Sequence, residues 1–268
     1  MMRGRSFAAA AAWLAVLAVA PALARAQPYY GPARTVFAQL QGVSRDQVVE
    51  AKVFMLTGVA DYTHVLRGQY KVDDEVLTGV LLLRCGARSC SGTRVLGAGG
   101  DKVKLLAVVD LEGKPASLGG NEPPTCCGGA EWDTALPSPG KRLRWPVLVI
   151  TTLREEMTTA LTRGRKEVTG TSRHGRLLLV SLRRADVKDR QLVLSAPTQE
   201  IGASGSGRST SYRTERGKQR ALDVIAREQR HLERTSRCRE PEPIEYKLVL
   251  KDGRYTRLDN LAQSRGCH

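Results

Sequence analysis

The amino-acid sequence predicts a mainly β fold, an antiparallel sandwich or two packed β modules with one or two short helices. Three observations predict it. Short apolar runs recur along the chain, turn-forming residues separate them, and Asp252-Gly253 lies between two strand-like segments near the C-terminus. Only 5% of the residues are aromatic, so valine, leucine, isoleucine and alanine must supply most of the core.

The first 26 residues have the pattern of a secretory signal peptide. Arg3 and Arg5 form a basic start, an apolar stretch follows, and the Ala-Arg-Ala triplet at 24–26 matches a cleavage site. The apolar stretch is shorter than the roughly 20 residues of a membrane-spanning helix. We therefore expect an exported protein, periplasmic or extracellular, with no transmembrane segment after cleavage. A retained N-terminal anchor is the alternative.

The first half of the mature chain, residues 27–111, is expected to be rich in β-strands. Residues 36–40 suit a short helical turn, and Ser44 with Gln47 fits a helix capping box. The alternation that begins at Val49 has a period of two, which favours a strand directly after that box. Strands are expected at residues 49–55, 62–72, 76–84, 94–96 and 103–111.

The middle of the chain, residues 112–146, is a Pro/Gly-rich loop or linker, because it holds six of the 12 prolines. A second β-rich half, residues 147–268, follows it. Its expected strands are 147–153, 176–182, 191–195 and the two arms of a terminal hairpin, 244–250 and 255–258. Between them, we expect a short helix or polar turn at 155–165 and a Gly/Ser loop at 202–211. Residues 217–235 suit a helix and a strand about equally.

The positive charge is concentrated in the second half. The formal net charge is +15, and residues 141–268 hold 28 basic but only 15 acidic residues. We favour an arginine-rich composition without a binding role as the explanation of this asymmetry. The alternative is an anionic partner, for example phospholipid head groups, envelope phosphates or acidic polysaccharide. Arg163, Arg165 and Lys166 are the predicted anion-binding residues, and the run from 208 to 239 is a second place for a basic patch.

The six cysteines predict disulfides, because an even number in an exported chain is typical of oxidised proteins. They are Cys85, Cys90, Cys126, Cys127, Cys238 and Cys267. Cys85 and Cys90 bracket a short turn, and Cys238 and Cys267 flank the terminal hairpin. The adjacent pair at 126–127 is expected either to bond to itself or to bond elsewhere. The cysteines and histidines lack zinc-site spacing, so no metal site is predicted.

No catalytic or cofactor motif is present, and no cofactor is predicted. Residues 202–209 imitate a phosphate-binding loop, but Arg208 replaces its lysine and a flexible turn explains the glycines better. His64 and His174 have no nucleophile signature near them. A pocket that joined a histidine, an acid and a hydroxyl would favour a hydrolase instead.

The sequence therefore predicts an exported, disulfide-stabilised protein with a non-enzymatic binding or structural role in the envelope or extracellular space. Its partner is expected to be an anionic envelope polymer or another envelope protein. Two alternatives remain open at this point. One is a secreted hydrolase whose site is assembled from distant residues, and the other is a purely electrostatic binder of anionic envelope polymer.

Overall fold

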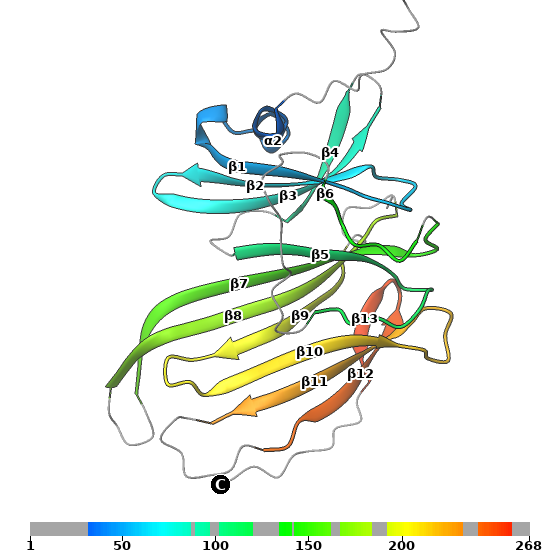
Figure 1. Ribbon diagram of the computed structural model, residues 1–268. Coiled ribbons are helices and arrows are strands. Elements are labelled where there is room, and N and C mark those ends of the chain that lie inside the picture. The colour runs from blue at the N-terminus through cyan, green and yellow to red at the C-terminus, as the bar shows by residue number, and fades with distance from the viewer. Residues whose placement is uncertain are drawn as a thin grey trace, which may run out of the picture.

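The computed structural model describes residues 32–86, 89–96, 102–119, 134–140, 142–161, 167–183, 192–232 and 241–258. These residues form two β-sheets that pack face to face, with a helix on the outer side of the smaller sheet (Figure 1). The predicted fold class, a mainly β antiparallel sandwich with one or two short helices, is confirmed.

The smaller sheet has the strand order β4-β3-β2-β1-β6. Its strands are β1 (Val48–Met55), β2 (His64–Val72), β3 (Glu75–Cys85), β4 (Cys90–Leu96) and β6 (Thr134–Ala135). The first four pair antiparallel, whereas the two-residue β6 runs parallel to β1. A helix, α2 (Ala33–Gln41), and a short 3₁₀ turn, η1 (Arg45–Gln47), precede β1.

The larger sheet is antiparallel throughout, in the order β13-β12-β11-β10-β9-β8-β7-β5. Its strands are β5 (Lys102–Asp110), β7 (Pro146–Leu161), β8 (Glu167–Ser181), β9 (Leu192–Ile201), β10 (Gly207–Glu215), β11 (Asp223–His231), β12 (Ile244–Lys251) and β13 (Arg254–Arg257). The sheet therefore joins β5, from the first half of the chain, to the edge of strands from the second half.

The apolar run in β3 is buried on both faces of the smaller sheet. Val80 and Leu82 belong to the core between the two sheets, whereas Leu81 and Leu83 belong to the core beneath α2. Successive side chains of a strand point to opposite faces, so a run without alternation is needed where both faces are covered. This explains why the sequence shows a continuous apolar run here.

The central strands of the larger sheet follow the same rule. Leu148 and Ile150 in β7 pack toward the smaller sheet, while Val147 and Val149 pack into a separate core on the opposite face. That second core also contains side chains of β8 to β13, and two leucines of the segment after β5, Leu111 and Leu118. It fills one end of this face of the larger sheet.

The described parts of the Pro/Gly-rich segment contact both sheets. After β5, the N–H of Leu118 donates to the carbonyl of Tyr212 (3.0 Å), and the N–H of Thr214 donates to that of Ala116 (2.8 Å). Further along, β6 pairs with β1. Asp110 of β5 holds the C-terminal end of the Pro/Gly-rich segment, because the N–H groups of Arg144 and Trp145 donate to its carboxylate at 3.0 and 2.8 Å.

Several local predictions are confirmed. The turn of the terminal hairpin is Asp252-Gly253, and both residues have positive φ, 51° and 80°, as a two-residue type I′ turn requires. Gln47 accepts a hydrogen bond from the N–H of Ser44 (2.8 Å), and β1 starts directly after this turn.

Two expectations in the second half are wrong at the described residues, and one alternative that the sequence leaves open is decided there. Residues 155–161 are neither helix nor turn, because β7 continues to Leu161, which pairs with Glu167 of β8. The ambiguous segment contains a strand, β11, and no helix at residues 223–231. The Gly/Ser loop ends at Ser206, and β10 begins at Gly207. In each case pairing with a neighbouring strand decides the conformation, and the local propensity of the residues does not indicate this pairing.

Candidate functional site

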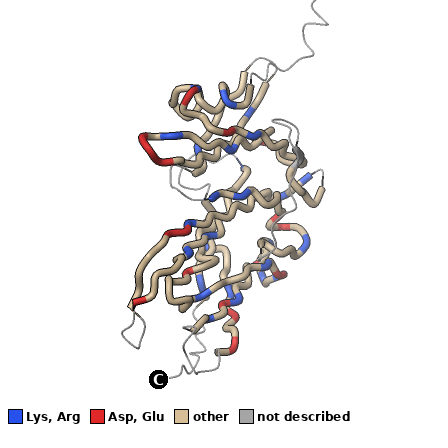
Figure 2. The backbone as a smooth tube through the Cα atoms, turned by 60° about the vertical axis from the view of Figure 1, so that its left-hand side comes forward, with Lys and Arg blue, Asp and Glu red and all other residues tan. Residues whose placement is uncertain are grey.

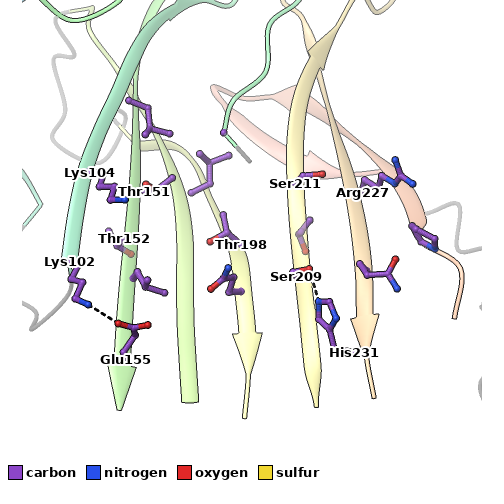
Figure 3. A pocket seen from close by; sticks show the side chains of 18 residues that line it. Lys102, Lys104, Thr151, Thr152, Glu155, Thr198, Ser209, Ser211, Arg227 and His231 are labelled. Atoms are coloured by element: carbon purple, nitrogen blue, oxygen red, sulfur yellow. Dashed lines mark hydrogen bonds and ion pairs between the residues drawn. The ribbon is translucent and has the colours of Figure 1, made fainter. Parts of the chain in front are cut away.

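The open end of the larger sheet holds a groove of about 810 Å³. On β7 its residues lie on the same face as Val147 and Val149 of the second core, whereas on β10 Ser209 and Ser211 alternate with Tyr212 of that core. Figure 3 shows the side chains that line it. One row of directly paired residues crosses this face, running Leu153, Gly175, Gln199, Ser209 and Gln229 from β7 to β11. Residues in register on neighbouring antiparallel strands point to the same side, so their side chains meet.

The groove lining is mostly polar, over an apolar floor. Its cations come from β5 and β11, its hydroxyl groups from β7, β9 and β10, and its two carboxamides from β9 and β11. These polar residues are Lys102, Lys104, Arg227, Thr151, Thr152, Thr198, Ser209, Thr210, Ser211, Gln199, Gln229, Glu155 and His231, and the floor includes Leu106, Leu153 and Leu177. The described residues of this lining include no Phe, Tyr or Trp side chain.

The one acidic side chain of the groove is neutralised by cations. Lys102 Nζ lies 2.6 Å from Glu155 Oε2, and Arg173 Nε lies 3.2 Å from Oε1. The hydrogen bond and charge of Lys102, with a smaller contribution from Arg173, lower the pKa of Glu155 below its usual value. Glu155 is therefore ionised at neutral pH, and its charge is already balanced.

Two further cations give the groove an excess of positive charge. Lys104 is exposed on β5, and Arg227 lies on β11 opposite Ser211. Within the described part of the chain, neither side chain forms an ion pair with a carboxylate at 4.0 Å or less. The groove thus combines these two cations, which form no ion pair with described carboxylates, with hydroxyl and amide groups, which is a suitable environment for an anion. Glu245, the direct partner of Arg227 on β12, has a lowered pKa, mainly because of Arg213 and with a smaller contribution from the charge of Arg227.

A serine–histidine pair lies in the wall of the groove. Ser209 Oγ on β10 is 2.8 Å from His231 Nε2 on β11. Gly207, rather than Ser209, is the direct partner of His231 in the register, so the hydrogen bond runs diagonally between the two strands. Both side chains are half-buried.

The groove thus contains the three group types that would favour a hydrolase: a histidine, a hydroxyl and an acid. His231 and Ser209 are bonded to each other, but Glu155 lies at the opposite side of the groove and is bound to Lys102 (Figure 3). The structure therefore brings together two of the three members of a catalytic triad and keeps the acid of the groove apart.

Seven of the other described basic residues of the second half form ion pairs with carboxylates. Arg208 contacts Glu200 and Glu228, and the guanidinium of Arg213 donates two hydrogen bonds to Glu245 (3.1 and 3.3 Å). Lys and Arg positions are interspersed with Asp and Glu positions along the larger sheet (Figure 2). The groove is distinguished by its polar lining, because its two cations that form no ion pair with described carboxylates, Lys104 and Arg227, lie among hydroxyl and amide groups.

The predicted cysteine and anion-binding residues are only partly described. Cys85 and Cys90 form a disulfide that closes the β3–β4 hairpin. Cys126, Cys127, Cys238 and Cys267 lie outside the described residues, as do Arg163, Arg165 and Lys166 and the signal segment at 1–26.

The other sequence motifs have structural roles. The loop that imitates a phosphate-binding motif is the tight turn between β9 and β10, where the N–H of Gly202 donates to the carbonyl of Ser206 (2.8 Å). His64 is buried in β2, with Nδ1 2.9 Å from the hydroxyl of Thr63. His174 lies on the face of β8 opposite to the groove, one position from Gly175.

Sequence reasoning missed the groove because its residues are far apart in the chain. Ser209 and Ser211 were assigned to a loop, although Thr210, Tyr212 and Thr214 alternate with them at a period of two. That alternation was the available signal for β10. No local pattern joins Lys104 to Arg227.

No protein-family model matches this chain, and comparisons with curated proteins and with solved structures find no significant match.

None of the described helices is long and apolar enough to cross a membrane. Among the described residues, no cluster of three or more His, Cys, Asp or Glu side chains has the arrangement of a metal site.

Proposed function

We propose that this chain is an exported, disulfide-stabilised protein that binds an anionic component of the cell envelope or extracellular space in the groove of its larger sheet. The observation that carries the proposal is the pair Lys104 and Arg227, which face the groove without forming ion pairs with described carboxylates. Glu155 does not offset them, because Lys102 and Arg173 already neutralise it.

Export is supported by the sequence of residues 1–26 and by chemistry that suits an oxidising compartment. The Ala-Arg-Ala triplet at 24–26 has the pattern of a cleavage site. Disulfides such as Cys85–Cys90 persist outside the cytoplasm and are rare inside it. The envelope and the extracellular medium are therefore the places where the ligand is sought.

The proposal is tested by binding of the mature protein to a soluble polyanion. Heparin and inorganic polyphosphate serve as two probes, titrated between low and physiological ionic strength. Binding through two cations releases about two counterions, so the logarithm of the affinity should fall with the logarithm of the salt concentration with a slope of about two. The Lys104→Gln/Arg227→Gln double variant should bind about tenfold more weakly, roughly 1.4 kcal/mol.

A matched control removes the same number of charges elsewhere. Lys71 and Lys251 are exposed at the ends of β2 and β12, away from the groove lining. The Lys71→Gln/Lys251→Gln variant should keep wild-type affinity. If both double variants lose affinity equally, binding depends on net charge alone and the groove is not the site.

A further inference from the structure

We propose that Ser209 is the nucleophile of an ester hydrolase site in this groove and that His231 is its general base. The distance of 2.8 Å between Ser209 Oγ and His231 Nε2 is within the range needed for proton transfer between a nucleophile and its base. Both residues line the groove, so a substrate in it can reach the hydroxyl. The hydrolase activity itself goes beyond anion binding, whereas the charge of its substrate rests on the proposed function.

Two glycines lie next to the pair and its neighbours on the sheet. Gly207 is the direct partner of His231 and presents no side chain beside the imidazole, and Gly175 is the direct partner of Gln199 on β8. A Cβ atom at Gly207 would collide with the backbone of Glu200, and one at Gly175 with the hydroxyl of Thr198. The strands therefore pack closely beside the pair, and Gly207 requires glycine.

Carboxamides flank Ser209 on both neighbouring strands. Gln199 on β9 and Gln229 on β11 are its direct partners in register, and such partners have Cβ atoms about 5 Å apart. Gln229 Nε2 donates to the carbonyls of Pro241 (3.0 Å) and Arg230 (3.1 Å), which holds that side chain in place. This leaves Gln199 as the carboxamide whose N–H groups stabilise a developing oxyanion, as amide side chains do in other acyl-transfer sites.

The reaction follows from this placement. With the imidazole proton on Nδ1, the Ser209 hydroxyl donates to Nε2. As Oγ attacks the ester carbonyl carbon, its proton moves to Nε2 and a tetrahedral oxyanion forms. The bond between that carbon and the alkoxy oxygen then breaks, and the alcohol leaves with the proton from Nε2. Water attacks the resulting acyl-serine in the same way, which releases the acid and restores the hydroxyl.

The substrate class is a carboxylic ester that carries a negative charge. Arg227 is the direct partner of Ser211, which is one same-face position along β10 from the nucleophile. Lys104 reaches the groove from the other side, on β5. An anionic group bound by these cations places the ester next to Ser209, which lowers the entropic cost of the attack.

The test uses a serine-directed fluorophosphonate and intact-mass measurement on the mature protein. Wild type should gain one adduct, located on Ser209 by peptide mapping. Ser195 provides a control, because it is an exposed serine of β9 outside the groove lining. The Ser195→Ala variant should be labelled like wild type, and Ser209→Ala should not be labelled. His231→Gln should slow labelling about 100-fold or more.

Turnover is measured with two nitrophenyl esters, neutral p-nitrophenyl acetate and the anionic mono-p-nitrophenyl ester of glutaric acid. The anionic ester should have the higher kcat/KM, and Lys104→Gln/Arg227→Gln should remove that preference. Absence of labelling in folded wild type, or labelling lost equally in Ser195→Ala, would overturn the proposal. Polyanion binding by Ser209→Ala distinguishes the anion-binding hypothesis from the hydrolase hypothesis. This variant should still bind the polyanion whether or not Ser209 is a nucleophile.

Discussion

The ring of Phe37 lies directly against Gly68, so that a Cβ atom on this glycine would be 2.5 Å from the ring atoms Cδ2 and Cε2. Gly79, the direct partner of Gly68 in the β2–β3 register, is the second glycine beneath the ring. Phe37 is fully buried. The two glycines thus form the recess in the smaller sheet that allows α2 to dock.

Gly68→Ala is expected to destabilise the protein by about 1 to 3 kcal/mol, because the added methyl group overpacks a filled core. Gly79→Ala should cost less, since its Cβ would lie 3.1 Å from Phe37 Cζ, where a small shift of the ring suffices. Urea denaturation measures both. In the Phe37→Leu background, Gly68→Ala should lower the free energy of unfolding by a smaller amount. An unchanged loss of stability would show that the added methyl group does not clash with the Phe37 ring.

Asp110 should make the stability depend on acid pH. Burial by itself raises the pKa of its carboxyl group, but hydrogen bonds from the N–H groups of Arg144, Trp145 and Glu112 outweigh this and lower the pKa below its usual value of 3.8. The folded state therefore favours the carboxylate. Its contribution is complete above the unfolded pKa and is lost as the pH falls through the folded pKa.

The variant Asp110→Asn tests that contribution. The substitution removes the negative charge and replaces one accepting oxygen by an NH₂ group, which cannot accept a hydrogen bond from a backbone N–H. We therefore expect the free energy of unfolding to fall by about 1 to 3 kcal/mol at neutral pH. The difference between variant and wild type should narrow as the pH falls below about 4. Equilibrium unfolding at a series of pH values measures it, and a difference that stays constant down to pH 2 would contradict this role.

The disulfide between Cys85 and Cys90 should stabilise the β3–β4 hairpin. The cysteines are separated by five positions, and closing so short a loop contributes about 2 kcal/mol in the chain-entropy model. We expect Cys85→Ser/Cys90→Ser to lower the unfolding free energy by about that amount. Dithiothreitol should then have a smaller effect on the double variant than on wild type.

A second disulfide, Cys238–Cys267, stays a prediction from the sequence, as these residues lie outside the described ones. It would enclose about 30 residues around the terminal hairpin and contribute a few kcal/mol. Peptide mapping of non-reduced protein from an oxidising compartment should recover the two cysteines in one linked peptide. Free thiols at both positions would rule this pairing out.

Cleavage after Ala26 is expected on export, and the mature protein should begin at Gln27. N-terminal sequencing or intact mass of the exported protein measures this directly. A product that keeps Met1 and sediments with membranes would instead indicate the retained N-terminal anchor.

The cations Arg163, Arg165 and Lys166 also await a test. They connect Leu161 of β7 to Glu167 of β8 and lie outside the described residues. If they add to anion binding, reversing all three charges should weaken polyanion binding at low salt without changing the unfolding free energy. Reversal at Lys71, Lys114 and Lys251, which are exposed elsewhere, is the control. Equal binding by wild type and the 163/165/166 variant would show that these three cations do not contribute to anion binding.

The sequence by itself determined the features that depend on neighbouring residues. The turn at Asp252-Gly253, the apolar run at 80–83 and the strand beginning at Val147 follow from backbone preferences and from burial on one or both faces. The pairing of Cys85 with Cys90 is of the same kind, because the two residues face each other across one turn.

Only the tertiary structure decided how far β7 extends, that residues 223–231 form a strand, and which side chains share the groove. Those outcomes depend on pairing with β8 and β10, and strand pairing is specified by partners that a local pattern does not identify. Lys104, Ser209 and Arg227 come from three different strands of the larger sheet. These three residues line one groove because of the strand order of the larger sheet. The sequence between them does not indicate that strand order.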